Sequence, residues 1–388
     1  MRGVRGPLSV ASIAALAFAL GAGGHADDTQ IADASPARAT AGSAPVQHFE
    51  YVFPAGAIDI YDIDNGNRLF QHIAMPQISG VRGVIMSPVT GALYVAYGGQ
   101  GGDTGSGSMV ALDLRTLKVI WSQDYHTGVD SIAITRDGRT IYLPAGEASH
   151  SGVWQIVDAA TGEVTGAIHA GAGAHNTVLS LDGKHVYLAG VDRPFLAVAS
   201  TTTNTVQKRI GPLRTGGRPF TINGAQTLAF TTAENLLGFQ VSSIETGTVL
   251  YTVRVPGFSW DPHTWSGSPS HGIALSPDER RLYVVDSPNG YVHVFDVSRL
   301  PASRPRHLAD IKLRHPPLNS STWLQPSRDG RYLYVGRSGD VIDTTKRAVV
   351  ARLPSLETTG DCLEIDWSNG RPIGTTSRYG LGYVRPRR

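Results

Sequence analysis

The sequence contains a single cysteine, Cys362, among 388 residues, so no intrachain disulfide can stabilise the fold. No cysteine lies directly after the apolar N-terminal stretch, so we expect no lipid anchor there. Charge of one sign is also scarce, with 34 Lys and Arg against 32 Asp and Glu. The chain therefore lacks the basic surplus of a nucleic-acid-binding domain, and we expect no nucleic-acid partner. No segment carries an apolar run long enough for a membrane-spanning helix.

Glycine and proline are abundant, at 45 and 23 residues, and 41% of the residues are hydrophobic. This composition is typical of a turn-rich, β-dominated chain with a sizeable core.

The N-terminus resembles an export signal. Arg2 and Arg5 precede the apolar stretch "LSVASIAALAFALGAG", and small residues surround Ala26. We expect a signal peptide over 1–26, cut after Ala26, and a periplasmic or extracellular protein. Residues 27–46 are rich in Ser, Ala, Thr and Asp, and we expect a disordered leader there. The remaining residues, 47–388, are predicted to form a single domain and a monomer.

A repeat of about 45 residues runs through this domain. Segments such as "DSIAITRDGRTIYLPAGE" and "SHGIALSPDERRLYVVDS" align as two short alternating strands around a tight turn. A second hairpin, such as "MVALDLRTLKVIW", follows most copies. Four strands per repeat are typical of a propeller blade. The seven copies align on Arg82, Asp130, His175, Arg218, His271, Thr322 and Cys362.

The two ends of the chain are complementary. The copy that starts at Cys362 has a first hairpin but no second, and 57–73 reads as a second hairpin with no first. We therefore predict an all-β, seven-bladed β-propeller whose last blade is closed by N- and C-terminal strands. Such closure leaves no free sheet edge.

The runs Leu93-Tyr94-Val95, Ile141-Tyr142-Leu143, Val186-Tyr187-Leu188, Leu282-Tyr283-Val284 and Leu333-Tyr334-Val335 carry a resemblance. The chain is similar to the YVTN-repeat β-propellers, a broad group of mostly bacterial secreted proteins, over about residues 47–385. The resemblance implies the fold and leaves the function open. Related seven-bladed propellers include lactonases and muconate-type cyclases, but no catalytic signature of theirs falls on numbered residues here.

The aligned starts form a ring at one rim of the predicted channel, because the first strand of each blade lines the channel. Arg82, Asp130, His175, Arg218 and His271 then converge on one axis. One Asp cannot neutralise two arginines, so we expect the ring to attract a small anionic molecule. On this basis Arg218→Ala should weaken binding without lowering the melting temperature. A cationic His175 or His271 would make binding weaker above about pH 6.5.

The longest insertion between blades, "GFSWDPHTWSGSPS", adds Trp260, His263 and Trp265 near this rim. Aromatic rings beside arginines suit a small organic anion, so these three join Arg82, Arg218, His175 and His271 as predicted ligand-binding residues. The alternative is that the insertion is a cap whose tryptophans pack against the rim. We also expect an ion pair between Asp286 and Arg337, at equivalent positions of neighbouring blades.

Two functions follow. The first is a secreted propeller that binds a small anionic molecule or a protein partner on its channel face. The second is an enzyme of the lactonase, cyclase or lyase type. In that case Arg82 and Arg218 would hold a carboxylate, and His175 or His271 would move a proton with Asp130 tuning it. We expect no cofactor and no metal, since the blades of His175 and His271 are not adjacent.

Overall fold

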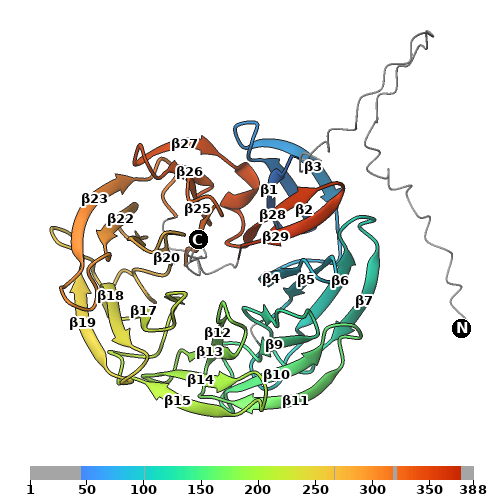
Figure 1. The fold of residues 1–388 in the computed structure, drawn as a ribbon, viewed down its shortest axis with the longest axis horizontal. Coiled ribbons are helices and arrows are strands. Elements are labelled where there is room, and N and C mark those ends of the chain that lie inside the picture. The colour runs from blue at the N-terminus through green and yellow to red at the C-terminus, as the bar shows by residue number, and fades with distance from the viewer. Residues whose placement is uncertain (1–44, 100, 266, 318–320, 377–388) are drawn as a thin grey trace, which may run out of the picture.

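The computed structural model describes residues 45–99, 101–265, 267–317 and 321–376. The expected signal peptide, 1–26, and the expected leader as far as residue 44 lie outside these residues. The described chain forms seven antiparallel sheets arranged around a central axis (Figure 1). The all-β, seven-bladed β-propeller is therefore confirmed.

The blades follow one another in chain order. The second comprises β4 (Val81–Ser87), β5 (Ala92–Tyr97), β6 (Ser108–Asp113) and β7 (Val119–Asp124). The third comprises β8 (Ala133–Ile134), β9 (Thr140–Pro144), β10 (Val153–Asp158) and β11 (Val164–His169). The fourth comprises β12 (Ala174–Leu179), β13 (His185–Gly190), β14 (Leu196–Ser200) and β15 (Val206–Ile210).

The remaining four-stranded blades repeat this order. The fifth comprises β16 (Phe220–Ile222), β17 (Leu228–Ala233), β18 (Leu236–Ser243) and β19 (Val249–Arg254). The sixth comprises β20 (Ile273–Leu275), β21 (Arg281–Asp286), β22 (Tyr291–Asp296) and β23 (Arg306–Lys312). The seventh comprises β24 (Leu324–Pro326), β25 (Tyr332–Val335), β26 (Asp340–Asp343) and β27 (Ala348–Arg352), followed by the 3₁₀ turn η1 (Pro354–Glu357).

The first blade is built from both ends of the chain. Its strand order is β29 (Arg371–Thr375), β28 (Cys362–Ser368), β1 (Gln47–Val52), β2 (Ala57–Asp62) and β3 (Arg68–Ala74). β28 pairs with β1 over six residues, and these two strands lie side by side in Figure 1. This sheet is therefore consistent with the predicted closure by terminal strands.

One detail of the closure differs from the prediction. The N-terminal part supplies three strands rather than a hairpin, because β1 inserts between β28 and β2. The predicted C-terminal hairpin does form, but its second strand, β29, becomes a fifth strand on the far side of β28. Its turn uses Asn369 and Gly370 with φ of 51° and 66°, as the Asn-Gly pair predicts.

The outermost strand of every described blade carries a bulge, one extra residue opposite the neighbouring strand. The register shifts at equivalent points, between Ile60/Tyr61, Ala111/Leu112, Ile156/Val157, Val198/Ala199, Val241/Ser242, Val294/Phe295 and Val341/Ile342. A bulge places one extra residue in one strand and so changes which side chains share a face of the sheet.

The hydrophobic core lies between neighbouring blades. Successive side chains of a strand point to opposite faces of its sheet, and apolar side chains occupy both faces. Val285 and Ala274 of the sixth blade, for example, pack in one cluster with Leu333 and Leu324 of the seventh. No helix among the described residues is long and apolar enough to span a bilayer.

Candidate functional site

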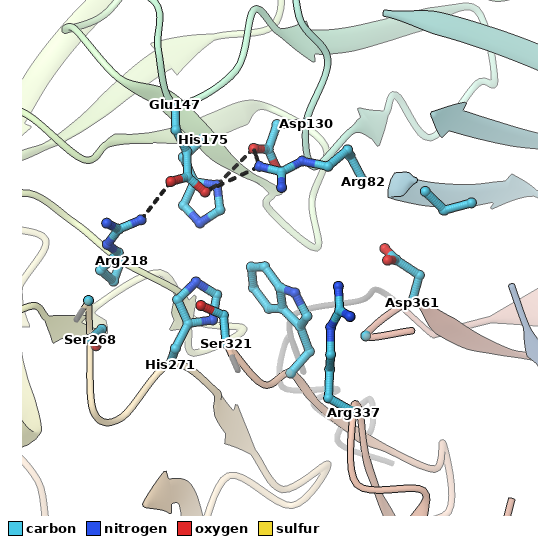
Figure 2. Close-up of a pocket in the computed structure, with 14 residues that line it drawn as sticks. Arg82, Asp130, Glu147, His175, Arg218, Ser268, His271, Ser321, Arg337 and Asp361 are labelled. Carbon is cyan, nitrogen blue, oxygen red and sulfur yellow. Dashed lines mark hydrogen bonds and ion pairs between the residues drawn. The ribbon is translucent and has the colours of Figure 1, made fainter. Parts of the chain in front are cut away.

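A cavity of about 370 Å³ opens at one rim of the channel (Figure 2). The cavity lies where the innermost strands begin, because each blade brings the start of its first strand to this rim. The lining residues are Val81, Arg82, Asp130, Glu147, His175, Arg218, Gly267, Ser268, His271, Ser321, Trp323, Arg337, Gly360 and Asp361. Five of the residues predicted from the aligned ring, Arg82, Asp130, His175, Arg218 and His271, are therefore brought together.

Glu147 is the central acceptor of the cavity. It lies in the loop between β9 and β10, and its carboxylate accepts from two arginines on opposite sides (Figure 2). Arg82 Nη2 lies 3.2 Å from Oε1, and Arg218 Nη1 lies 3.0 Å from Oε2. Burial raises the pKa of Glu147, but the charges of His175 and of both arginines outweigh it and hold that pKa at about 2.

The two arginines have further acidic partners. Arg82 Nη2 donates to Asp130 Oδ2 at 2.6 Å, and Arg218 Nη2 pairs with Glu234. The charge of Asp130 raises the pKa of Arg82 above its ordinary value despite burial. The sequence analysis counted only Asp130 against the two arginines, whereas Glu147 and Glu234 supply further negative charge, so the ring does not need an external anion to be neutralised.

His175 is buried beside the same carboxylates. Its Nδ1 lies 3.1 Å from Asp130 Oδ2 and 3.5 Å from Glu147 Oε1. The distances allow contact, but neither ring nitrogen meets the angular requirements of a hydrogen bond with any described residue. His175 therefore presents a buried imidazole at an acidic pair, with hydrogen-bonding capacity that the described residues do not use.

An aromatic wall completes the cavity. The ring centroids of His175, His271 and Trp323 lie 5.7, 5.8 and 4.8 Å apart in pairs. His271 Nδ1 lies 3.2 Å from the carbonyl oxygen of Thr322, which fixes its proton on Nδ1 and leaves Nε2 as an acceptor. Burial, reinforced by His175 and Arg218, lowers the pKa of His271 to about 3. His271 is thus neutral near pH 7, which argues against a cationic role for it.

Arg337 lies on the opposite side of the cavity, near Asp361 (Figure 2). Its backbone has φ of 62° and is held by bonds from its N–H to the carbonyl groups of Leu356 and Thr359. The exposed guanidinium donates only a long bond of 3.5 Å, to Thr358 O, and forms no ion pair with any described residue.

The expected pair between Asp286 and Arg337 does not form. Asp286 instead accepts from both the side chain and the backbone N–H of Asn289, and contacts His293. Arg337, whose backbone is left-handed, lines the cavity instead.

The insertion between blades does not place its three predicted ligand-binding residues at the cavity. Trp265 is buried, Trp260 packs against the apolar cluster between the fifth and sixth blades, and His263 is exposed. None of the three is among the described residues that line the cavity, whereas Gly267 and Ser268 of the same segment are. This arrangement agrees with the alternative that the tryptophans anchor a cap.

Sequence reasoning missed Glu147, Trp323 and Arg337. Each had a recognisable position: Glu147, Glu234 and Arg337 all follow the second strand of their blade, and Trp323 follows the aligned residue Thr322. Aligning the ends of the second strands, as well as the starts of the first, would have placed them at this rim.

Asp130, Glu147 and His175 also offer three possible metal ligands within 4.8 Å of one another. Arg82 Nη2, however, contacts the oxygens of both carboxylates. A guanidinium already occupies the position that a cation would take, so this set does not fit a metal ion unless Arg82 moves.

No known family profile matches the chain, so the YVTN-repeat resemblance is not confirmed. No curated protein is significantly similar to it either. Solved structures do share its fold. One is Kuenenia stuttgartiensis hydrazine synthase, with 17% identity over 79% of this chain and 88% of that chain and a TM-score of 0.53. Another is dihydro-heme d1 dehydrogenase NirN in complex with DHE, with 15% identity over 85% and 73% and a TM-score of 0.56. At these identities the likeness is one of fold, the seven-bladed β-propeller.

Proposed function

We propose that this propeller binds a small organic anion in the channel cavity, with Arg337 as the residue that contacts the charge. The observation that carries the proposal is the difference among the three lining arginines. Arg82 and Arg218 are saturated by carboxylates, whereas Arg337 forms no ion pair with any described residue. An arginine fork that faces a cavity suits a planar carboxylate.

The composition of the cavity narrows the ligand further. Three arginines and three carboxylates line it, so its formal charge is zero when the histidines are neutral. A balanced site favours a monoanion over a polyanion such as a nucleotide. Trp323 and His271 provide an aromatic wall, and a volume of about 370 Å³ is at the small end of ligand pockets. A compact aromatic or unsaturated monocarboxylate meets these conditions.

A structural neighbour, NirN, has been solved in complex with DHE, so a ligand site on a propeller of this kind has a parallel. The low identity gives no reason to transfer that ligand to this chain.

Benzoate is a suitable probe, with benzamide as its uncharged counterpart. We expect benzoate to bind wild-type protein in titration calorimetry, and benzamide to bind more weakly. Arg337→Gln should lower benzoate affinity by roughly 10- to 150-fold, because a hydrogen bond to a charged group contributes about 1.5–3 kcal/mol.

Arg347 is the matched control. It is an exposed arginine of the same blade, also with a left-handed backbone (φ 54°), and it does not line the cavity. Arg347→Gln should leave benzoate affinity unchanged. Equal binding of benzoate and benzamide, or wild-type affinity in Arg337→Gln, would refute the proposal.

The enzyme alternative is favoured by one observation, the buried His175 beside Asp130 and Glu147. A histidine next to a carboxylate is a common acid–base arrangement. His271 does not suit that role, because a pKa of about 3 is too far below working pH for an efficient base. If the protein is a lactonase, it should hydrolyse simple γ- or δ-lactones, and His175→Gln should abolish turnover while the exposed His72→Gln should not.

We also propose that the protein is exported. This rests on the apolar N-terminal stretch and the small residues before Ala26. Mass spectrometry of protein from an extracytoplasmic fraction should give a mature chain that begins at Asp27. An intact N-terminus in such a fraction would contradict the assigned cleavage.

A further inference from the structure

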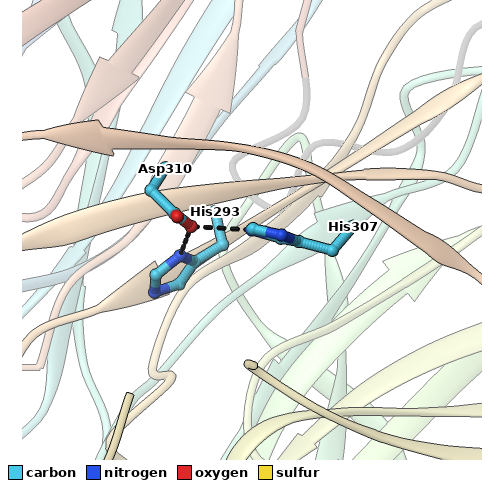
Figure 3. Close-up of side chains that lie close together, drawn as sticks. All are labelled: His293, His307 and Asp310. Atoms are coloured by element: carbon cyan, nitrogen blue, oxygen red, sulfur yellow. Dashed lines mark hydrogen bonds and ion pairs between the residues drawn. The ribbon is translucent and has the colours of Figure 1, made fainter. Parts of the chain in front are cut away.

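A second cluster of metal-ligating side chains lies away from the channel cavity, on the two outer strands of the sixth blade (Figure 3). His293 lies on β22, and His307 and Asp310 lie on β23. His293 Nδ1 and His307 Nε2 each lie 2.7 Å from Asp310 Oδ1. Two imidazoles from different strands therefore converge on one carboxylate oxygen.

The bulge of this blade explains how the three side chains meet. His293 and Asp310 are direct cross-strand partners, and His307 lies three residues before Asp310. In a regular strand residues three apart point to opposite faces. The register shift at Val294/Phe295 leaves Leu308 as the extra residue, so His307 and Asp310 share a face.

The buried imidazole is also held from behind. His293 Nε2 lies 3.2 Å from Asp286 Oδ2, and both side chains are fully buried. Asn289 fixes Asp286, donating from Nδ2 to both carboxylate oxygens at 2.9 and 2.8 Å. A carboxylate that accepts the second ring N–H of a histidine is the usual outer partner of a metal-bound histidine.

We propose that His293, His307 and Asp310 form a zinc-type divalent metal site, with Asp286 orienting His293. Two neutral imidazoles and one carboxylate are ligands that zinc accepts. The carboxylates of Asp310 and Asp286 together balance the two positive charges of the ion. Without an ion, both ring nitrogens of His293 face carboxylate oxygens, at 3.2 and 2.7 Å.

The geometry needs a small adjustment. Ligand atoms around tetrahedral zinc lie roughly 3.3 Å apart, since each is about 2.0–2.1 Å from the ion. The present separations of 2.7 Å must therefore widen by about half an ångström. His307 and Asp310 can move, because their side chains are 25% and 34% exposed. Their exposure also leaves a route for the ion and an open coordination position.

In the other metal-ligating clusters among the described residues, an arginine contacts the carboxylates, which is not the case in this site. Arg82 contacts both carboxylates of the Asp130, Glu147 and His175 set. Arg328 contacts Asp366 in the set of His48, Glu364 and Asp366. Asp310, by contrast, forms ion pairs with the two histidines and with no described Arg or Lys. No guanidinium competes for the position of the ion here.

The test is metal binding by full-length protein that carries no histidine tag, stripped with chelator and then dialysed. We expect one equivalent of Zn²⁺ in titration calorimetry, and one equivalent of Co²⁺ with the visible absorption of a low-coordinate site. His307→Gln should abolish stoichiometric binding, and Asp286→Asn should weaken it by roughly 10- to 100-fold. Zn²⁺ should also raise the melting temperature of the wild type but not of His307→Gln.

The first blade provides the matched control. Asp59 and His72 occupy the same cross-strand positions, with His72 Nδ1 at 2.6 Å from Asp59 Oδ1, but Leu69 replaces the second histidine. His72→Gln should leave metal binding unchanged. Less than one equivalent of Zn²⁺ in the wild type, or wild-type affinity in His307→Gln, would overturn the proposal. His307 is partly exposed, so its variant should fold even if an Asp310 variant does not.

Discussion

The guanidinium of Arg218 and the carboxylate of Glu147 form an ion pair across the channel cavity, with Nη1 and Oε2 3.0 Å apart. The two residues belong to the fifth and third blades, so the pair passes over the fourth. Glu147 also contacts Arg82 of the second blade. One carboxylate thus connects three blades at the rim, which gives the ring of charges a structural role in addition to any ligand.

Arg218→Ala should destabilise the protein, contrary to the expectation from the sequence. The substitution removes the cation that Glu147 and Glu234 share, and it leaves the partly buried Glu147 with Arg82 alone. We expect a loss of about 1–3 kcal/mol in the free energy of unfolding, measured in urea. Arg214→Ala, at an exposed arginine of the same loop, should change it by less than about 0.5 kcal/mol. An unchanged or raised stability in Arg218→Ala would show that the ion pairs of Arg218 do not stabilise the protein without a ligand.

The closing blade should make stability depend on pH. Glu50 and Glu364 are direct partners on β1 and β28, and both are buried. Burial, with the charge of Glu364, raises the pKa of Glu50 well above its ordinary range. Burial also raises the pKa of Glu364 to about 7, although His48 and the Arg328 N–H lower it and Asp366 adds to the rise. Glu364 raises the pKa of His48 to about 9 against the effect of burial.

All these shifts have the same sign for stability. A raised pKa in the folded state means that the unfolded chain loses its proton first, so rising pH favours unfolding. We expect stability to fall between about pH 4.5 and 7 through Glu364, and between about 6.5 and 9 through His48. Glu50→Gln should therefore raise the melting temperature at pH 8 and leave it unchanged at pH 4.5. The exposed Glu163→Gln should do neither, and equal effects of Glu50→Gln at both pH values would contradict this reading.

The contact between the closing strands β1 and β28 should contribute a large part of the free energy of unfolding. Leu363 on β28 is fully buried in a cluster with Phe49 and Tyr51 of β1, whereas Leu69 on β3 of the same sheet is 56% exposed. Leu363→Ala should cost about 2–5 kcal/mol in the free energy of unfolding. Leu69→Ala should cost less than about 0.5 kcal/mol. Similar costs for the two would mean that the closing strands add little.

The fold could be predicted because its signals are local. Asp113, Asp158, Asp296 and Asp343 each accept backbone N–H bonds in the turn after a third strand, an interaction within a few residues of the chain. β1 was missed because "QHFEYV" has no turn motif and no counterpart in the alignment, and its place is set by pairing with β28 more than 300 residues away.

The site could be predicted only as a ring. The alignment placed Arg82 and Arg218 at one rim, but their acidic partners Glu147 and Glu234 lie in loops after second strands, which the alignment did not compare. Trp260 and Trp265 were predicted to contact the ligand because aromatic rings suit organic anions. Their actual surroundings are decided by packing, which buries Trp265 and places Trp260 on the core.

His271 should remain neutral well below the ordinary range of a histidine. Burial lowers its pKa to about 3, and the Thr322 carbonyl oxygen holds the proton on Nδ1. A lowered pKa means that the unfolded chain binds the proton more tightly, so this group stabilises the fold above about pH 6.5 and loses that contribution as the pH falls towards 3. The loss should approach about 1.4 kcal/mol per pH unit within that window. Nitrogen-15 spectra of the imidazoles should therefore show a neutral Nδ1–H tautomer for His271 at pH 5. Its signals are assigned by their disappearance in His271→Gln. The free energy of unfolding of that variant should fall less on acidification than that of the wild type. An imidazolium signal at pH 5 would show that the cavity is wetter, and more able to hold a cation at His271, than its buried aromatic wall implies.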